Sequence, residues 1–156
     1  MDALKPNMIQ VYYEDASPEV GIFHFGYHDF HVVEPMRLPS VRPRHALHYV
    51  FSGAGELYIG KRRYEVHEKQ FFLAPKGVSL CYYPQTDFPW SYLWLSYDGA
   101  AADALNERIS LTAEQPVRDA PPDFDEMPLR LRLGEFAERG SVSYFGVRRV
   151  FCFFSA

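Results

Sequence analysis

Two aromatic stretches with strand-like patterning, each broken by turn residues, constrain the fold of this chain more than any other feature. The first reads His48-Tyr-Val-Phe-Ser-Gly-Ala-Gly55, and the second reads Pro89-Trp-Ser-Tyr-Leu-Trp94. Between them lie a hairpin pattern centred near Gly60 and a short run, Phe71–Ala74, that ends at Pro75. Short strands at this spacing, with no alternation of strands and helices, predict an antiparallel sandwich or barrel.

Strand-forming residues predict further strands on both sides of this region. The expected strands are Met8–Tyr13, Val20–Val33, His45–Ser52, Val78–Tyr83 and Trp90–Tyr97. We expect the last two to pair with each other as a hairpin with a long loop across residues 84–89. Helices are predicted at Ala100–Ile109 and Asp123–Arg139, with a linker at 112–122 between them.

Composition and charge narrow the function classes. The chain has 156 residues, of which 47% are hydrophobic, and this suits one domain with a packed core. Its net charge of −4 argues against a surface that grips a phosphate backbone, and the basic run Lys61–Arg63 lies at an expected hairpin tip, where water solvates it. Cys81 and Cys152 form no CxxC pair, which suits reduced thiols in a cytoplasmic protein. We find no signal peptide and no apolar run of membrane-spanning length, so no membrane partner is expected.

The two patterns, written HYVxSGxG and PWxYxW, together resemble the cupin-like ligand-binding domain at the N-terminus of AraC-type transcriptional regulators. The resemblance covers about residues 26–109. It implies an all-β, cupin-like double-stranded β-helix (a jelly-roll barrel) followed by one or two C-terminal α-helices. The expected division is an N-terminal arm at 1–19, a ligand-binding barrel at 20–98, a helical dimerisation and linker segment at 99–139, and an atypical apolar tail at 140–156.

The function that this resemblance implies is sensing of a small-molecule effector. The expected effector is a sugar, the barrel is its binding site, and the arm is a candidate lid. The sequence shows neither of the two helix-turn-helix units of such regulators, so DNA contact is expected only through a part not present in this chain. Three explanations of this absence stay open: the chain is a shortened regulator, an isolated ligand domain, or a product whose sequence diverges near its end. A homodimer through the C-terminal helices is expected.

Metal-binding barrels of this kind have a pattern that the present chain only half matches. Pro75-Lys-Gly77 resembles their Pro-x-Gly turn, but the position three residues after Gly77, where they have a histidine, is Leu80. His45 and His48 are three residues apart in a predicted strand, so their side chains point to opposite faces. His24 and His28 share a face but lie roughly 13 Å apart at about 3.3 Å per residue, and His31 lies on the other face. We therefore expect neither a metal nor another cofactor.

The sequence contains no recognisable catalytic constellation. Ser52-Gly-Ala-Gly55 is not a G-x-S-x-G nucleophile elbow, Cys81 lies in the middle of a predicted strand, and no glycine-rich phosphate loop is present. We therefore expect no enzyme activity. Two other readings stay open: a small metal-independent cupin enzyme, such as an isomerase or lyase, and an oligomerisation module that binds no ligand and has a solid barrel interior.

The strongest signal for a binding site is the aromatic strand near residue 92. By alternation, Trp90, Tyr92 and Trp94 share one face with Ser96, and Leu93, Leu95 and Tyr97 share the other. An aromatic wall with polar tips suits the apolar C–H face of a sugar ring. A core filled with Trp and Tyr is the competing interpretation.

The resemblance also suggests which residues contact the effector. It places Tyr92 and Trp94 in the pocket, together with Tyr82 or Tyr83, and an arginine before the first barrel strand as a polar anchor. The candidate arginines are Arg37, Arg42 and Arg44, with Arg42 preferred. Whether His48 or Tyr49 faces the barrel interior stays open. The predicted contact residues are Arg42, Arg44, His48, Tyr82, Tyr92 and Trp94.

Overall fold

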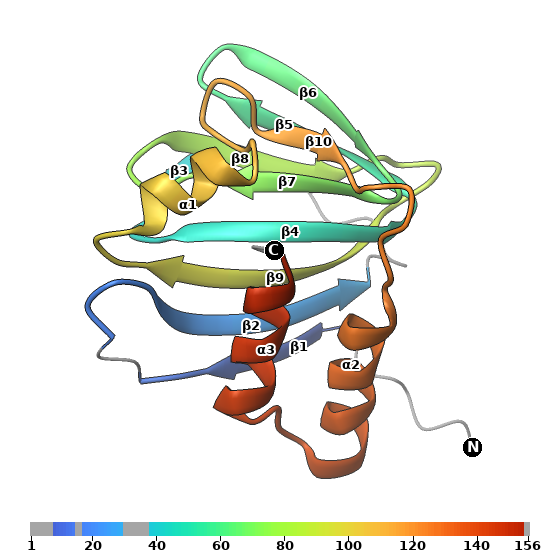
Figure 1. Ribbon diagram of the computed structural model, residues 1–156. Coiled ribbons are helices and arrows are strands. Elements are labelled where there is room, and N and C mark those ends of the chain that lie inside the picture. Colours follow the sequence, from blue (N-terminus) through green and yellow to red (C-terminus); the bar gives the residue numbers. More distant parts are fainter. Residues whose placement is uncertain (1–7, 15–16, 30–37, 155–156) are drawn as a thin grey trace.

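The computed structural model describes residues 8–14, 17–29 and 38–154 (Figure 1). In this part of the chain, two antiparallel sheets form a barrel. One sheet has six strands in the order β1–β2–β9–β4–β7–β10, namely Met8–Tyr12, Gly21–Asp29, Ser91–Asp98, His45–Ser52, Gln70–Ala74 and Val117–Asp119. The other has four strands in the order β3–β8–β5–β6, namely Ser40–Val41, Ser79–Pro84, Ala54–Ile59 and Arg62–His67.

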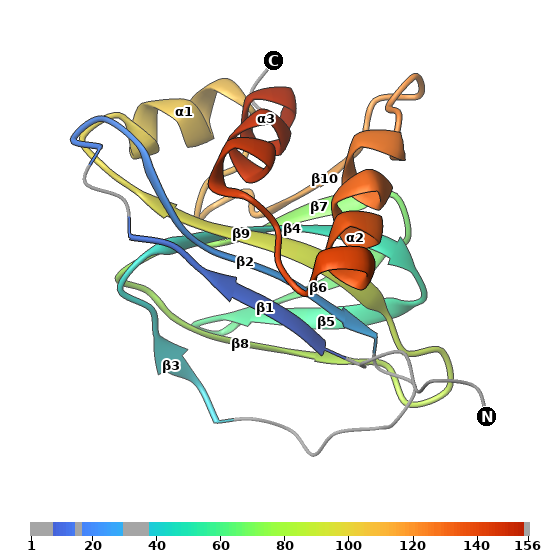
Figure 2. The ribbon, with the colours of Figure 1, turned by 90° about the horizontal axis from the view of Figure 1, so that it is seen from below.

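Three helices in the described residues cover the outer face of the six-stranded sheet. They are α1 (Ala102–Arg108), α2 (Met127–Arg139) and α3 (Tyr144–Phe154). Figure 2 shows three layers: the helices, the six-stranded sheet and the four-stranded sheet. The six-stranded sheet therefore lies in the middle layer and is covered on both faces.

Two apolar cores follow from these layers. The outer core, between the helices and the six-stranded sheet, contains Leu47, Tyr49, Leu93 and Leu95. The inner core, between the two sheets, contains Ala46, Val50, Leu57, Phe72, Leu80, Trp90, Tyr92 and Trp94. Neighbouring residues of β4 and β9 thus alternate between the two cores, as expected for strands with apolar residues on both faces. Burial on both faces explains why these two strands lie side by side in the middle of the sheet.

The fold class expected from the sequence is confirmed, and so is the hairpin at Gly60, whose φ of 58° is in the left-handed region that glycine adopts freely.

The expected hairpin of β8 with β9 is wrong. Strand β8 pairs with β3 and β5, whereas β9 pairs with β2 and β4 in the other sheet. The connection between β8 and β9 crosses from one sheet to the other, because β9 buries both of its faces only in the middle layer.

The C-terminal region contains more regular structure than expected. The predicted helices correspond to α1 and α2, and α3 lies in the segment for which we expected a tail, so the described chain has three helices instead of one or two. Helix α3 places Val147, Val150 and Phe151 in the outer core, at the spacing of one helix face. Strand β10 lies in the expected linker, where Val117 is the partner of Phe72 in β7. No helix in the described residues has the length and apolarity needed to cross a bilayer.

Candidate functional site

A cavity of about 350 Å³ opens on the barrel side of the six-stranded sheet. Strand β9 contributes Tyr92, Trp94 and Ser96 to its wall, and β2 contributes His24 and His28. The volume is at the lower end of the range of about 300–1,000 Å³ that is usual for small-molecule sites. The cavity therefore suits a compact ligand.

The edge strand β1 closes one side of this cavity. Met8, Gln10 and Tyr12 line it, because alternate residues of a strand point to the same side. Strand β1 pairs only with β2, so the sheet ends here in the described residues. Part of the expected N-terminal arm is thus a strand that lies against the cavity.

The indole of Trp94 is positioned by a glycine on the neighbouring strand. Gly26 is the partner of Trp94 in the pairing of β2 with β9. A Cβ atom on Gly26 would lie 2.0 Å from Cζ2 of the indole, so only glycine leaves room for this ring. The indole N–H of Trp94 then donates a hydrogen bond of 3.3 Å to Nδ1 of His24. Gly26 thus allows the contact that orients His24.

His24 is neutral near pH 7 and carries its proton on Nε2. The indole nitrogen is a donor only, so Nδ1 of His24 accepts, and the proton of the neutral ring is on Nε2. Burial, together with the positive charges of Arg42 and Arg44, lowers the pKa of His24 to about 4. The ring also stacks on Tyr12, with 4.2 Å between the ring centres. Nε2 is buried and has no hydrogen-bond partner among the described residues.

Arg42 and Tyr82 form the opposite side of the cavity. Arg42 follows β3 directly, and its guanidinium carbon lies 5.2 Å from the centre of the Tyr82 ring. The Nε atom of Arg42 is buried, and no atom of the described residues bonds to it. The hydroxyl of Tyr82 lies 3.1 Å from Nε2 of His48, whose ring stacks on Phe72 at 4.1 Å. Within residues 8–14, 17–29 and 38–154, Arg42 therefore lies against an aromatic face, and no carboxylate forms an ion pair with it.

The structure brings together four of the six predicted contact residues. Arg42, Tyr82, Tyr92 and Trp94 line the same cavity. His48, and not Tyr49, faces the barrel interior, but it is 1% exposed and lies behind Tyr82, outside the cavity lining. Arg44 also lies outside the lining, with its guanidinium carbon 3.9 Å from the centre of the Phe23 ring. Binding of a ligand by any of the six residues stays a prediction.

Two further candidates, Arg37 and His31, lie outside the described residues. From the sequence, His24 and His28 are candidates only as metal ligands, and the N-terminal arm is a candidate lid with no predicted site residue. The alternation of Met8, Gln10 and Tyr12 in a predicted strand was the sequence signal that these three side chains share one face. The expected shared face of His24 and His28 agrees with the structure, because both line the cavity.

The residues considered for a metal site do not converge. His45 lies on the other side of β4 from His48, and its Nε2 is 3.1 Å from a carboxylate oxygen of Asp103 in α1. Leu80, at the position where the metal-binding pattern has a histidine, is buried in the inner core. Within residues 8–14, 17–29 and 38–154, no three His, Cys, Asp or Glu side chains are close enough to hold a metal ion. A metal-free protein stays a prediction, which elemental analysis checks.

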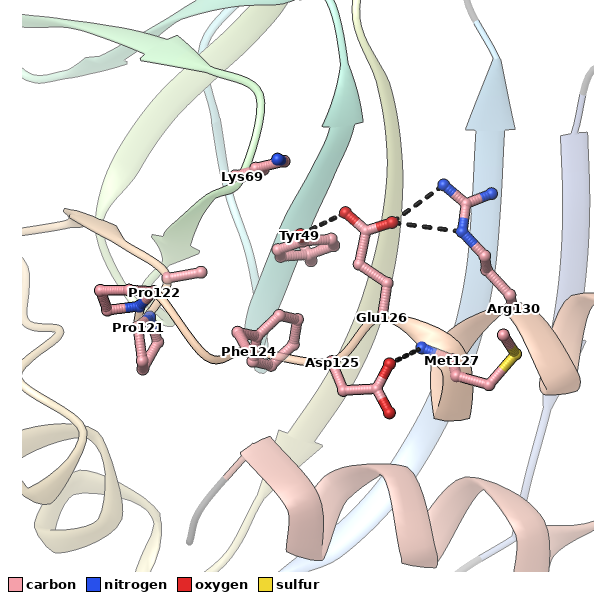
Figure 3. Close-up of a pocket in the computed structure, with 10 residues that line it drawn as sticks. Tyr49, Lys69, Pro121, Pro122, Phe124, Asp125, Glu126, Met127 and Arg130 are labelled. Carbon is pink, nitrogen blue, oxygen red and sulfur yellow. Dashed lines mark hydrogen bonds and ion pairs between the residues drawn. The ribbon is translucent and has the colours of Figure 1, made fainter.

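A second pocket, of about 560 Å³, lies on the helix side of the sheet (Figure 3). Three of its polar side chains bond to one another: the hydroxyl of Tyr49 donates to Glu126 at 2.6 Å, and Arg130 donates to the same carboxylate at 2.9 Å. Phe124 packs against Tyr49, with 5.0 Å between the ring centres. These contacts join the barrel to α2, so this pocket is a seam between two layers. The barrel cavity, where two buried donors have no partner in the described part of the chain, is the better candidate for a ligand site.

Comparisons with known proteins identify the family of this domain. Residues 21–136 match the model of a family described as the AraC-like ligand binding domain. The Msm operon regulatory protein of Streptococcus mutans is 30% identical over 73 residues, which are 47% of this chain and 26% of that protein. This chain therefore spans about a quarter of that relative.

Solved structures with similar folds include the protein YhaK from Escherichia coli. The TM-score is 0.54 at 11% identity, and the match covers 76% of this chain and 52% of YhaK. A cupin 2 conserved barrel domain protein from Leptotrichia buccalis gives a TM-score of 0.43 at 14% identity, over 63% of this chain and 44% of that one. The likeness to YhaK shows the fold, and the family model covers well over half of the sequence. The chain belongs to the family of AraC-like ligand binding domains.

Proposed function

We propose that this domain senses a small molecule of the carbohydrate class in the barrel cavity and thereby controls DNA binding by a part of the regulator outside this chain. The observation that carries the proposal is the cavity itself. Trp94, Tyr92 and Tyr82 surround it with aromatic faces, and Arg42 and His24 place buried donors without partners beside them, among the described residues. Aromatic faces and convergent polar groups are what a sugar ring needs.

The N-terminal strand is the proposed moving part. Strand β1 is an edge strand that contributes Gln10 and Tyr12 to the cavity, and its other edge is free of pairing in the described residues. A ligand that contacts β1 stabilises the conformation in which β1 covers the cavity. The equilibrium shifts only as far as the ligand's affinities for the covered and open states differ.

The assembly that we propose is a homodimer formed through the C-terminal helices. Met127 and Leu131 of α2 are each 54% exposed and lie one turn apart, and Phe145 of α3 is 74% exposed. Exposed apolar side chains in one region are typical of protein interfaces. The same proposal includes a cytoplasmic location and the expected division of the chain into an arm, a ligand-binding barrel, a helical dimerisation and linker segment and a tail, at 1–19, 20–98, 99–139 and 140–156.

Binding without catalysis is also part of the proposal. No Asp or Glu of the described residues lines the cavity, so a carboxylate acid or base for isomerase or lyase chemistry has no position there. A module that only oligomerises needs no cavity, and the wall of Tyr92, Trp94 and Arg42 encloses one.

A thermal-shift screen of carbohydrates tests the proposed function. A ligand at 100 times its Kd stabilises the folded state by about 2.7 kcal/mol, which raises the melting temperature visibly. We expect at least one carbohydrate to do so, and calorimetry then gives its stoichiometry. In a gel shift with promoter DNA at physiological salt, we expect the chain by itself to show no specific retention. Specific retention that survives excess competitor DNA contradicts the assignment of DNA binding to another part.

A further inference from the structure

The cavity carries positive charge and lacks a protein counter-ion. In the described residues its lining includes one arginine, Arg42, and no aspartate or glutamate. The two charged groups that act on His24 are Arg42 and Arg44, and both are cationic. Arg42 also acts on His48 behind the wall. The charged groups that the described residues place at this cavity and beside His24 are therefore cationic.

Two hydrogen-bond donors at this cavity have no acceptor in the described protein. They are Nε–H of Arg42 and Nε2–H of His24, and both nitrogens are buried. Buried donors in folded proteins are almost always paired, because losing water without gaining a partner costs free energy. Both side chains line the cavity, from opposite sides, so a ligand between them that supplies acceptor oxygens is the candidate partner for these donors. A ligand with a negative charge there also neutralises Arg42.

We infer that the effector is a sugar acid, a compact hydroxylated ring or chain whose carboxylate binds between Arg42 and His24. This inference rests on the proposed function, because it concerns the same cavity. A neutral sugar hydroxyl accepts from these donors but leaves the guanidinium without a counter-charge. A carboxylate matches the paired N–H groups of an arginine in both geometry and charge. Tyr92 and Trp94 then face the apolar side of the ring.

The charge count favours a carboxylate over a phosphate ester. A phosphate monoester carries about −1.5 to −2 charges at pH 7 and is usually held by several cationic groups. Here one guanidinium, Arg42, lines the cavity among the described residues, and the neighbouring imidazole of His24 is neutral at pH 7. A single negative charge therefore balances the lining.

Isothermal titration calorimetry of the intact chain at pH 7, with matched sets of ligands, tests this inference. The sets are D-glucose, D-glucuronate and glucose 6-phosphate, and D-galactose, D-galacturonate and galactose 6-phosphate, with D-gluconate as an open-chain acid. We expect an acid to bind more tightly than its neutral sugar by roughly tenfold or more, which corresponds to about 1.4 kcal/mol. We also expect it to bind more tightly than the matched phosphate.

Substitution of Arg42 shows whether the preference comes from the cavity. In Arg42→Gln, both ligands should bind more weakly, because Arg42 lines the cavity, but the acid should lose more affinity than the neutral sugar and so lose its advantage. Arg62→Gln is the matched control, because Arg62 is exposed on β6 and the change in net charge is the same. Arg42→Lys keeps the charge without the paired N–H groups and should lose part of the preference. Circular dichroism and the melting temperature show whether each variant is folded. If Arg42→Gln does not fold, Arg42→Lys takes its place in the comparison with the parent.

Four results overturn the inference. If a neutral sugar binds as tightly as its acid, or a phosphate binds most tightly, the carboxylate assignment is wrong and the sensing function stands. If Arg42→Gln and Arg62→Gln weaken the acid equally, the preference is a general charge effect, and the assignment to this cavity is wrong. If no member of any set binds while the thermal-shift screen identifies another, neutral carbohydrate, the sugar-acid assignment is wrong and the sensing function stands; if that screen identifies no carbohydrate, the proposed function is wrong.

Discussion

Gly55 lies directly against the indole of Trp90. A Cβ atom on Gly55 would lie 2.2 Å from Cε3 of the ring, and Trp90 is fully buried in the inner core. Two residues earlier, a Cβ on Gly53 would lie 2.2 Å from the carbonyl oxygen of Pro89. The two sequence patterns that resemble the family are thus in physical contact, because the glycines of the first make room for the Pro-Trp pair of the second.

The first prediction concerns this contact. Gly55→Ala should destabilise the fold by about 1–3 kcal/mol, because the added methyl group overpacks a buried site. The control is Gly134→Ala in α2, where a Cβ has no neighbour within 4 Å. That change should stabilise the protein by about 0.5–1 kcal/mol, since alanine favours a helix over glycine. Urea unfolding measures both, and equal stabilities of the Gly55→Ala variant and the parent would contradict the packing argument.

The second prediction concerns the aromatic wall of the cavity. Trp94→Phe keeps most of the packing but removes the indole N–H that holds His24, so affinity for the effector should fall by roughly tenfold, or about 1.4 kcal/mol. Tyr92→Phe should also weaken binding, because it removes the polar tip of a lining residue.

Leu93→Ala is the control for the aromatic wall. Leu93 lies in the outer core on the other face of β9, so this change should cost about 2–5 kcal/mol of stability without altering the affinity of the folded protein. Calorimetry and urea unfolding separate the two effects. If Trp94→Phe and Tyr92→Phe both bind a cognate ligand like the parent, the wall is only core.

The third prediction is loss of stability in mild acid. Burial lowers the pKa of His24, His45 and His48; Arg42 adds to the effect at His24 and His48, whereas Asp103 opposes it at His45. The unfolded chain, with histidine pKa values near 6.5, therefore binds more protons than the folded chain below that pH. The free energy of unfolding should fall as the pH decreases from about 6.5 towards about 4, the folded pKa of His24.

Urea unfolding at a series of pH values measures this dependence. His24→Gln should make the dependence shallower, because the variant lacks the buried imidazole with the lowered pKa. A slope that is the same in the His24→Gln variant and the parent would show that His24 does not contribute.

The fourth prediction concerns the seam between the barrel and α2. Tyr49→Phe removes the 2.6 Å hydrogen bond to Glu126 and should cost about 1–2 kcal/mol, because the bond is to a charged group and Tyr49 is buried. Tyr12→Phe removes a bond to Gln10 on an exposed ring and should change stability by less than about 0.5 kcal/mol. Urea unfolding compares the two variants, and a Tyr49→Phe protein as stable as the parent contradicts this role of the seam.

Much of the local structure was predictable from the sequence. Alternation in His45–Ser52 and Trp90–Tyr97 predicted which side chains share a face, and the structure confirms it, with Trp90, Tyr92 and Trp94 on one side and Leu93, Leu95 and Tyr97 on the other. A glycine predicted the hairpin at residue 60. These features depend on the two-residue period of a strand and on backbone preferences of single residues, which are local properties.

The partners of strands and the extent of the cavity were not predictable in the same way. Strand β8 follows the same local rules whether it pairs with β9 or with β5, and only burial of both faces of β9 excludes the first pairing. Helix α3 is rich in residues that favour strands. Its position on the sheet depends on the contact of Phe151 with Tyr97, at 5.1 Å between ring centres, and this contact exists only once the sheet has formed.

For the candidate site too, some features follow from the sequence and others only from the tertiary structure. The sequence alone determined that aromatic residues at 92 and 94 share a face and that an arginine precedes the first barrel strand. Only the tertiary structure decided that Arg42 lines the cavity and Arg44 does not, that His48 and not Tyr49 faces inward, and that His24 joins the site. The physical reason is that these choices depend on which surfaces the two sheets and the helices bury against each other, and that burial is a long-range property of the whole fold.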